Sequence, residues 1–227
     1  MIDALLKSIR QLPDKRISAV ILGSIVASII VLGILGTVAV MLVGSLVATG
    51  WGWLDTTIEF LSGAGTVVLA LFLFPAFVGV VASLFLEQVA DAVEDEHYPS
   101  LPEAAGLGMG ASVWIALKFA GVVLLVNLLA LPFYVLFLFL PPANLVLFYV
   151  VNGYLLGREY YELVGLRRLA MADATKLRRA NRGRVFVAGM LITLLTTIPI
   201  VNFVAPVLAT AFMTHIFHGL RQDTAAA

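Results

Sequence analysis

Residues 119–157 read FAGVVLLVNLLALPFYVLFLFLPPANLVLFYVVNGYLLG and contain no charged side chain. A helix of about 20 apolar residues crosses the hydrocarbon core of a bilayer, so this run is long enough to enter a membrane. Pro132, Pro141 and Pro142 interrupt it. Since proline kinks or ends a helix, we expect two helices of about 14–20 residues joined by a proline turn. Pieces of this length are short for full crossings and predict a re-entrant hairpin over 111–157, its turn covered by other helices or another subunit.

Three further runs, 17–54, 60–86 and 185–220, are uncharged apart from two histidines in the last one. The first lacks proline and predicts one long, tilted transmembrane helix over 17–50, which ends near two tryptophans suited to the headgroup interface. The second predicts a transmembrane helix that continues into water as an acidic amphipathic extension, over 60–97.

The last run is interrupted by Pro199, Asn202 and Pro206. Its two halves predict a second re-entrant hairpin over 185–220, for the same reason as in the first. The predicted fold class is therefore an all-α integral membrane protein with two long transmembrane helices and two half-penetrating helical hairpins. We expect residues 1–227 to form a single membrane domain.

The composition agrees with this fold class. Hydrophobic residues make up 61% of the chain and charged residues 12%, and the mean hydropathy is +1.04. Soluble domains are nearer to about 45–50% apolar and about 25% charged. Fourteen acidic and fourteen basic side chains are too few to cover the surface of a soluble protein of this size.

Several classes of function are disfavoured. The formal net charge of zero gives no sign of a nucleic-acid partner. The absence of cysteine excludes disulfides, thiolate metal ligands and a cysteine nucleophile. His215 and His218 lack further ligands nearby in the sequence, so we expect no metal site. The chain has no Walker loop, GxGxxG, HExxH or nucleophile elbow, and we expect neither a cofactor nor enzymatic activity.

The distribution of positive charge predicts the topology. The N-terminal segment, 1–16, has four Lys and Arg residues, the segment 158–184 has eight, and 51–59 has none. By the positive-inside rule the first two are cytoplasmic, in a multi-pass membrane protein. Two crossings followed by two returning hairpins put both on one side. This scheme also places there the acidic stretch 87–103, which has no Lys or Arg.

Two helix ends are candidate anion sites. Lys15 and Arg16 lie beside the start of the first span, where cations and free backbone N–H groups can together hold an oxyanion. Asn202 follows Pro199 at the second turn, and broken helices in transporters point their N-termini at anionic substrates. The alternatives are charges that only set topology, for the first, and a simple hairpin turn, for the second.

Arg158, Glu159 and Glu162 directly follow the apolar run and are candidate pathway residues. Arg158 and Glu162 share a helix face. Ionisable residues near membrane depth are unfavourable and by default indicate a functional pathway. The alternative is an interfacial anchor with a local ion pair. The remaining basic residues of 158–184 fit either an anion funnel or contacts with anionic lipid headgroups.

Four passages resemble the CysZ family of bacterial sulfate permeases and its wider etoposide-induced superfamily. The resemblance covers nearly the whole chain. The passages are LPDKRIS at 12–18, LFPAF at 73–77 running into LEQVADAVE at 86–94, YVVNGYLLGREYYE at 149–162, and FVAG at 186–189 continuing through TTIPIVNFVAPV at 196–207.

The resemblance implies two true transmembrane helices, two half-penetrating hairpins and a homo-oligomer. It also implies sulfate movement without ATP binding by the chain, and a sulfate site at a Gly-x-Arg-Arg type turn before the first span. Lys15 and Arg16 match that turn in charge, while Asp14 stands in it and its glycine is missing. Arg158, Glu159 and Glu162 fall on the helix where the family places polar residues.

The predicted function is passive transport of sulfate or a similar oxyanion across the bacterial inner membrane, supplying sulfur assimilation and cysteine biosynthesis. Lys15 and Arg16 would bind the anion, and Arg158, Glu159, Glu162 and Asn202 would line its path. The expected partners are the oxyanion, the lipid bilayer and further copies of the chain. The alternative is a non-transporting membrane scaffold or a regulatory subunit of a membrane complex.

Overall fold

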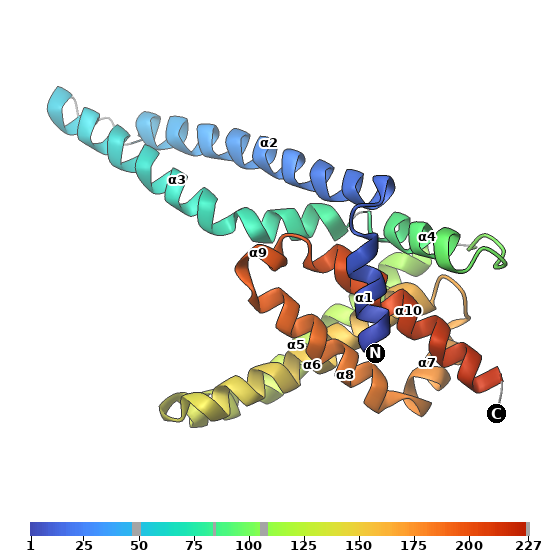
Figure 1. Cartoon of the computed structure of the whole chain (residues 1–227). Coiled ribbons are helices and arrows are strands. Elements are labelled where there is room, and N and C mark those ends of the chain that lie inside the picture. The colour runs from blue at the N-terminus through green and yellow to red at the C-terminus, as the bar shows by residue number, and fades with distance from the viewer. Residues whose placement is uncertain (47–50, 84, 105–108, 226–227) are drawn as a thin grey trace.

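Figure 1 shows a computed structural model of the chain, which describes residues 1–46, 51–83, 85–104 and 109–225. In these ranges every regular element is a helix, which confirms the predicted all-α class. Two long arms extend from a common base, and both chain termini lie at the base (Figure 1).

The first arm is a pair of long helices, α2 (Lys15–Leu46) and α3 (Gly52–Ser83), which run side by side. It is preceded by the short amphipathic helix α1 (Ile2–Gln11) and followed by α4 (Leu86–His97). Both short helices belong to the base, where each packs against the last helix of the chain.

The structure departs from the single helix predicted over 60–97. Helix α3 begins earlier, at Gly52, and an aspartate in its first turn complements the positive helix end. It ends at Ser83, and Phe85 has non-helical dihedral angles of −116° and 7°. After this break α4 buries an apolar stripe that includes Leu86, Val89 and Val93 in the base.

The second arm consists of α5 (Met109–Leu136), the 3₁₀ turn η1 (Phe137–Phe139) and α6 (Pro141–Gly165). Pro132 lies inside α5 and does not end it, so both helices are longer than predicted. The break comes at Leu140, whose φ of −128° and ψ of 73° reflect the bias against helical geometry before a proline. Pro141 starts α6, where its missing N–H has no helical partner to lose.

The rest of the chain packs at the base. It comprises α7 (Met171–Ala180), α8 (Arg182–Thr197), the short α9 (Pro199–Asn202) and α10 (Ala205–Ala225). Helix α10 contacts elements from both arms and forms the centre of the largest apolar core. The core side chains of α10 with an exposed fraction of zero are Val207, Ala209, Phe212, Met213, Phe217 and Leu220.

Three glycines allow α6 and α8 to approach to backbone contact. A Cβ atom on Gly157 would lie 2.5 Å from the carbonyl oxygen of Val185, and one on Gly153 would lie 2.7 Å from Cγ of Met190. A Cβ atom on Gly189 would collide with the backbone of α6. Small residues serve this purpose where helices pack in a membrane. The close contact fixes the second arm against the base.

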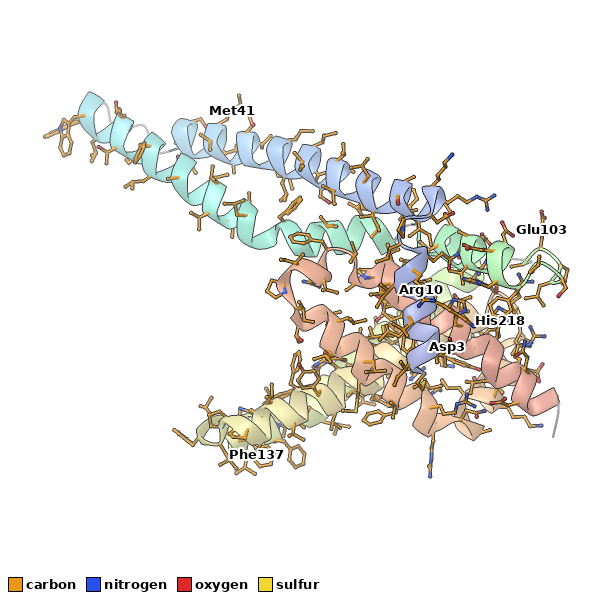
Figure 2. All side chains as sticks on the ribbon, viewed as in Figure 1. Asp3, Arg10, Met41, Glu103, Phe137 and His218 are labelled. Atoms are coloured by element: carbon orange, nitrogen blue, oxygen red, sulfur yellow. The ribbon has the colours of Figure 1, made fainter. Side chains whose placement is uncertain are left out.

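The arms carry many exposed apolar side chains. Three helical segments are long and apolar enough to cross a membrane, namely Lys15–Val43, Gly52–Leu71 and Leu117–Phe139. Met41 and Phe137 lie toward the far ends of the two arms, whereas Glu103 and His218 lie at the opposite, polar end (Figure 2). Large apolar side chains are exposed along both arms, Leu22, Ile34, Met41, Leu71, Leu128 and Phe139 among them. Soluble monomers rarely expose apolar surface of this extent. The chain is therefore a membrane protein.

Candidate functional site

The predicted site residues lie in three places: at the start of α2, on α6, and at the end of α9. At α2, the carboxylate of Asp14 accepts hydrogen bonds from the backbone N–H groups of Arg16 at 2.8 Å and Ile17 at 3.2 Å. An oxyanion at this helix start would need the same two amides. They are instead bound to Asp14, which caps the helix. The Arg16 guanidinium lies 2.5 Å from Asp95, while Lys15 is exposed.

Asn202 is partly exposed, and its backbone N–H donates to the carbonyl of Ile198 at 2.8 Å. It does not line the cavity at the root of the second arm, which contains Arg158 and Glu162. The structure therefore brings together only two of the predicted residues, Arg158 and Glu162, as their spacing of four on one helix predicts.

Arg158 and Glu162 line a cavity of about 660 Å³ at the root of the second arm, which we call the cationic cavity. It is enclosed by α5, α6, α7 and the start of α8. Its apolar and hydroxyl-bearing walls carry five cationic side chains and one carboxylate. The charged residues of the lining are Lys118, Arg158, Glu162, Arg178, Arg179 and Arg182.

The inner part of the cavity is an ion-paired group. The Nε of Arg158 donates to Oε1 of Glu162 at 2.7 Å, and the Arg178 guanidinium lies 3.8 Å from the same oxygen. All three side chains are largely buried, with exposed fractions of 10% for Arg158, 18% for Glu162 and 17% for Arg178. Among the described residues, the Nε of Arg178 is buried without a hydrogen-bond partner.

The outer part of the cavity is a rim of exposed cations, Lys118, Arg179 and Arg182. In the part of the chain that the structure describes, we find no ion pair for these three side chains. Arg182 is also the first residue of α8, whose first turn contains no acidic residue. A positive helix end beside an arginine favours an anion.

Glu159 is half-buried on α6, next to Arg158, and does not line the cavity. Lys118 was not among the predicted site residues, although a lone cation at the edge of a long uncharged run could have indicated it. Nothing in the sequence indicates that α7 and α8 converge on α6, because this depends on tertiary packing.

A second charged group, which we call the Glu94 cluster, holds the base together. Glu94 is 2% exposed and lies 2.6 Å from Arg168, 3.3 Å from Arg167 and 2.8 Å from the Nε2 of His218. Arg167 also pairs with Asp91. The cluster thus connects the acidic stretch to the basic segment and puts both at one end of the molecule, as the topology scheme expects.

The Glu94 cluster lowers the pKa of the Glu94 carboxyl. Burial by itself raises the pKa of the Glu94 carboxyl, but hydrogen bonds from His218 and Arg168 and the charges of Arg167 and Arg168 outweigh it. The pKa falls from 4.5 to about 2. The carboxylate therefore stays ionised inside the folded base.

The fold and the site together define an integral membrane protein of helical arms with a cationic cavity at the polar root of one arm. Residues 4–206 match the family model described as sulfate transporter CysZ/etoposide-induced protein 2.4, and the chain belongs to this family. Neither a curated protein nor a solved structure matches the chain significantly. The family is one of transporters rather than enzymes, with sulfate as the transported substrate.

Proposed function

We propose that the protein is a passive permease for sulfate or a similar oxyanion in the bacterial inner membrane, where it supplies sulfur assimilation and cysteine biosynthesis. The observation that carries the proposal is the cationic cavity, in which five cationic side chains surround one carboxylate. Cations gathered in a low-dielectric recess raise the local concentration of anions and stabilise a bound one. Arginine is well suited to the task because its planar fork matches oxyanion geometry.

Along the proposed path the anion meets the predicted residues one after another. Lys15 and Arg16 attract the anion at the cytoplasmic end of α2, although Asp14 accepts hydrogen bonds from the adjacent amides. Arg158 draws it into the cavity, and Glu159 and Glu162 set its position through charge. Asn202 lines the path at the second turn. We further propose that copies of the chain assemble as a homo-oligomer, whose neighbours cover the polar turns at membrane depth.

The test is uptake of radiolabelled sulfate by proteoliposomes that contain the purified protein. We expect flux above that of empty liposomes, and a loss of most of it in Arg158→Ala. The double variant Lys15→Ala with Arg16→Ala tests the proposed site at the start of α2. Lys176→Ala is a matched control, since Lys176 is an exposed cation on α7 that does not line the cavity. Absence of flux from the unaltered protein would refute the proposed function.

A second candidate function is a non-transporting scaffold or regulatory subunit of a membrane complex. The capping of α2 by Asp14 favours it, because this carboxylate occupies amides that an oxyanion site at the helix start would need. Stable co-purification of a different membrane protein, together with no sulfate binding by calorimetry, would support this function over transport.

A further inference from the structure

The cationic cavity has two zones that differ in what their cations can do. The rim cations, Lys118, Arg179 and Arg182, are exposed, whereas the inner cations, Arg158 and Arg178, are largely buried. Buried charges need a partner, because burial removes the water that would otherwise stabilise them. The inner cations share one such partner, the carboxylate of Glu162.

Glu162 therefore occupies the position that an oxyanion would take. Its Oε1 accepts a hydrogen bond from Arg158 at 2.7 Å and lies 3.8 Å from Arg178. The buried Nε of Arg178 has no partner among the described residues, so the inner zone has at least one buried donor that Glu162 does not use. An anion that passes the rim meets cations already held by a carboxylate.

We propose that Glu162 is a tethered competitor that exchanges with the transported anion, and that this exchange selects doubly charged oxyanions. The inference rests on the proposed transport function and names the substrate class and the release step of the same cavity. A dianion with several oxygens attracts Arg158 and Arg178 more strongly than a single carboxylate does, and displaces Glu162. A monovalent anion such as chloride or nitrate lacks that advantage.

The same exchange explains how the anion leaves. A dianion held by unopposed buried arginines would be released slowly. Because Glu162 remains attached within reach, it returns to Arg158 as the anion departs, and the inner cations are never left unpaired. Glu162 thus lowers affinity and speeds release, while the rim cations set the rate of capture.

The test compares sulfate binding and flux in Glu162→Gln and the reciprocal variant Arg158→Gln. Glutamine keeps the size of Glu162 and removes its charge, so we expect about tenfold tighter binding of sodium sulfate by calorimetry, the scale of one charged hydrogen bond, with lower flux at saturating sulfate. Arg158→Gln leaves Arg178 as the single inner cation beside Glu162 in the cavity, so we expect about tenfold weaker binding. Damage to the fold would weaken binding in both variants, which makes the opposite signs diagnostic.

Two controls complete the design. Glu87→Gln makes the same chemical change on α4, at an exposed position outside the cavity, and should leave binding and flux unchanged. Glu162→Asp keeps the charge and should keep the selectivity for sulfate over nitrate, which Glu162→Gln reduces. If the unaltered protein transports sulfate but Glu162→Gln binds it equally or more weakly, the exchange is wrong and the transport function stands. If the unaltered protein gives no flux, the transport function fails. If neither the unaltered protein nor Glu162→Gln binds sulfate, the exchange fails.

Discussion

Replacing Glu94 by glutamine should destabilise the base of the molecule more than any other single loss of charge there. Glu94 is 2% exposed, and its partners Arg167 and Arg168 are 3% and 8% exposed. Glutamine is nearly the same size but presents no negative charge to two buried guanidinium groups and His218. Only Arg167 keeps another carboxylate partner, Asp91.

Two lines of reasoning give the same magnitude. Breaking a buried ion pair by removing one partner destabilises a protein by about 3–5 kcal/mol, and the retained pair of Arg167 places this case near the lower value. Independently, the fall in the pKa of Glu94 from 4.5 to about 2 corresponds to about 3 kcal/mol of preferential stabilisation of its ionised form. We therefore expect the free energy of unfolding to fall by about 3 kcal/mol.

The pH dependence follows with a definite sign. Because the pKa of Glu94 is lower in the folded protein, its contribution is fully present above pH 4.5 and is lost as the pH falls towards about 2. The glutamine variant should lack this part of the acid sensitivity. The difference between the two curves therefore reports the loss of the Glu94 carboxylate and of its ion pairs.

Thermal unfolding in detergent measures both effects. For a chain of this size a loss of about 3 kcal/mol lowers the Tm by about 6–12 °C. Glu87→Gln, on the exposed face of the same helix, is the matched control. Because Glu87 lies in the first turn of α4, it should lower the Tm by no more than about 4 °C. This account of the base is refuted if Glu94→Gln has the same Tm as the unaltered protein near neutral pH. It is also refuted if the variant keeps the full acid sensitivity of the unaltered protein.

Three more predictions concern the helix contacts. Gly189→Ala should destabilise the protein by about 3 kcal/mol or more in thermal unfolding, since the new methyl group has to push α6 and α8 apart; Gly219→Ala, which has open space, should not. Asp14→Ala should cost about 1 kcal/mol by the same measurement through loss of the α2 cap, and a larger loss would show that Asp14 does more than cap. Asp95→Asn should change stability by less than about 1 kcal/mol, because the Asp95–Arg16 pair is two-thirds exposed on both sides; a larger loss would contradict that reasoning.

The arms of the fold could be predicted from the sequence because their signals are local. Uncharged runs longer than a bilayer span identify membrane helices, and the breaks at Pro141 and Pro199 follow from the geometry before proline. The same rule overestimated Pro132, which α5 accommodates inside the helix. It also gave no warning of the turn at Phe85, which serves the packing of α4 rather than any local preference.

The site was predictable only where its parts are close in the sequence. The spacing of Arg158 and Glu162 predicts their pairing, and the structure has it. The contact between Glu94 and His218 joins residues 124 positions apart, and no periodicity encodes it. The capping role of Asp14 could have been inferred, because an aspartate directly before a helix is a common cap. The cationic cavity required knowing that α7 and the start of α8 meet α5 and α6.

The central position of α10 in the base has a consequence for how the protein is made. This helix packs against α1, α4, α6 and α8, yet it leaves the ribosome after all four of them. The apolar arms precede it and can insert into lipid as they are synthesised. Until α10 follows, α1, α4 and α6 lack the helix that covers part of their apolar faces, and His218 is missing from Glu94. A nascent chain halted before residue 205 would therefore be anchored in the bilayer but open at its base, where proteases and chaperones can recognise it.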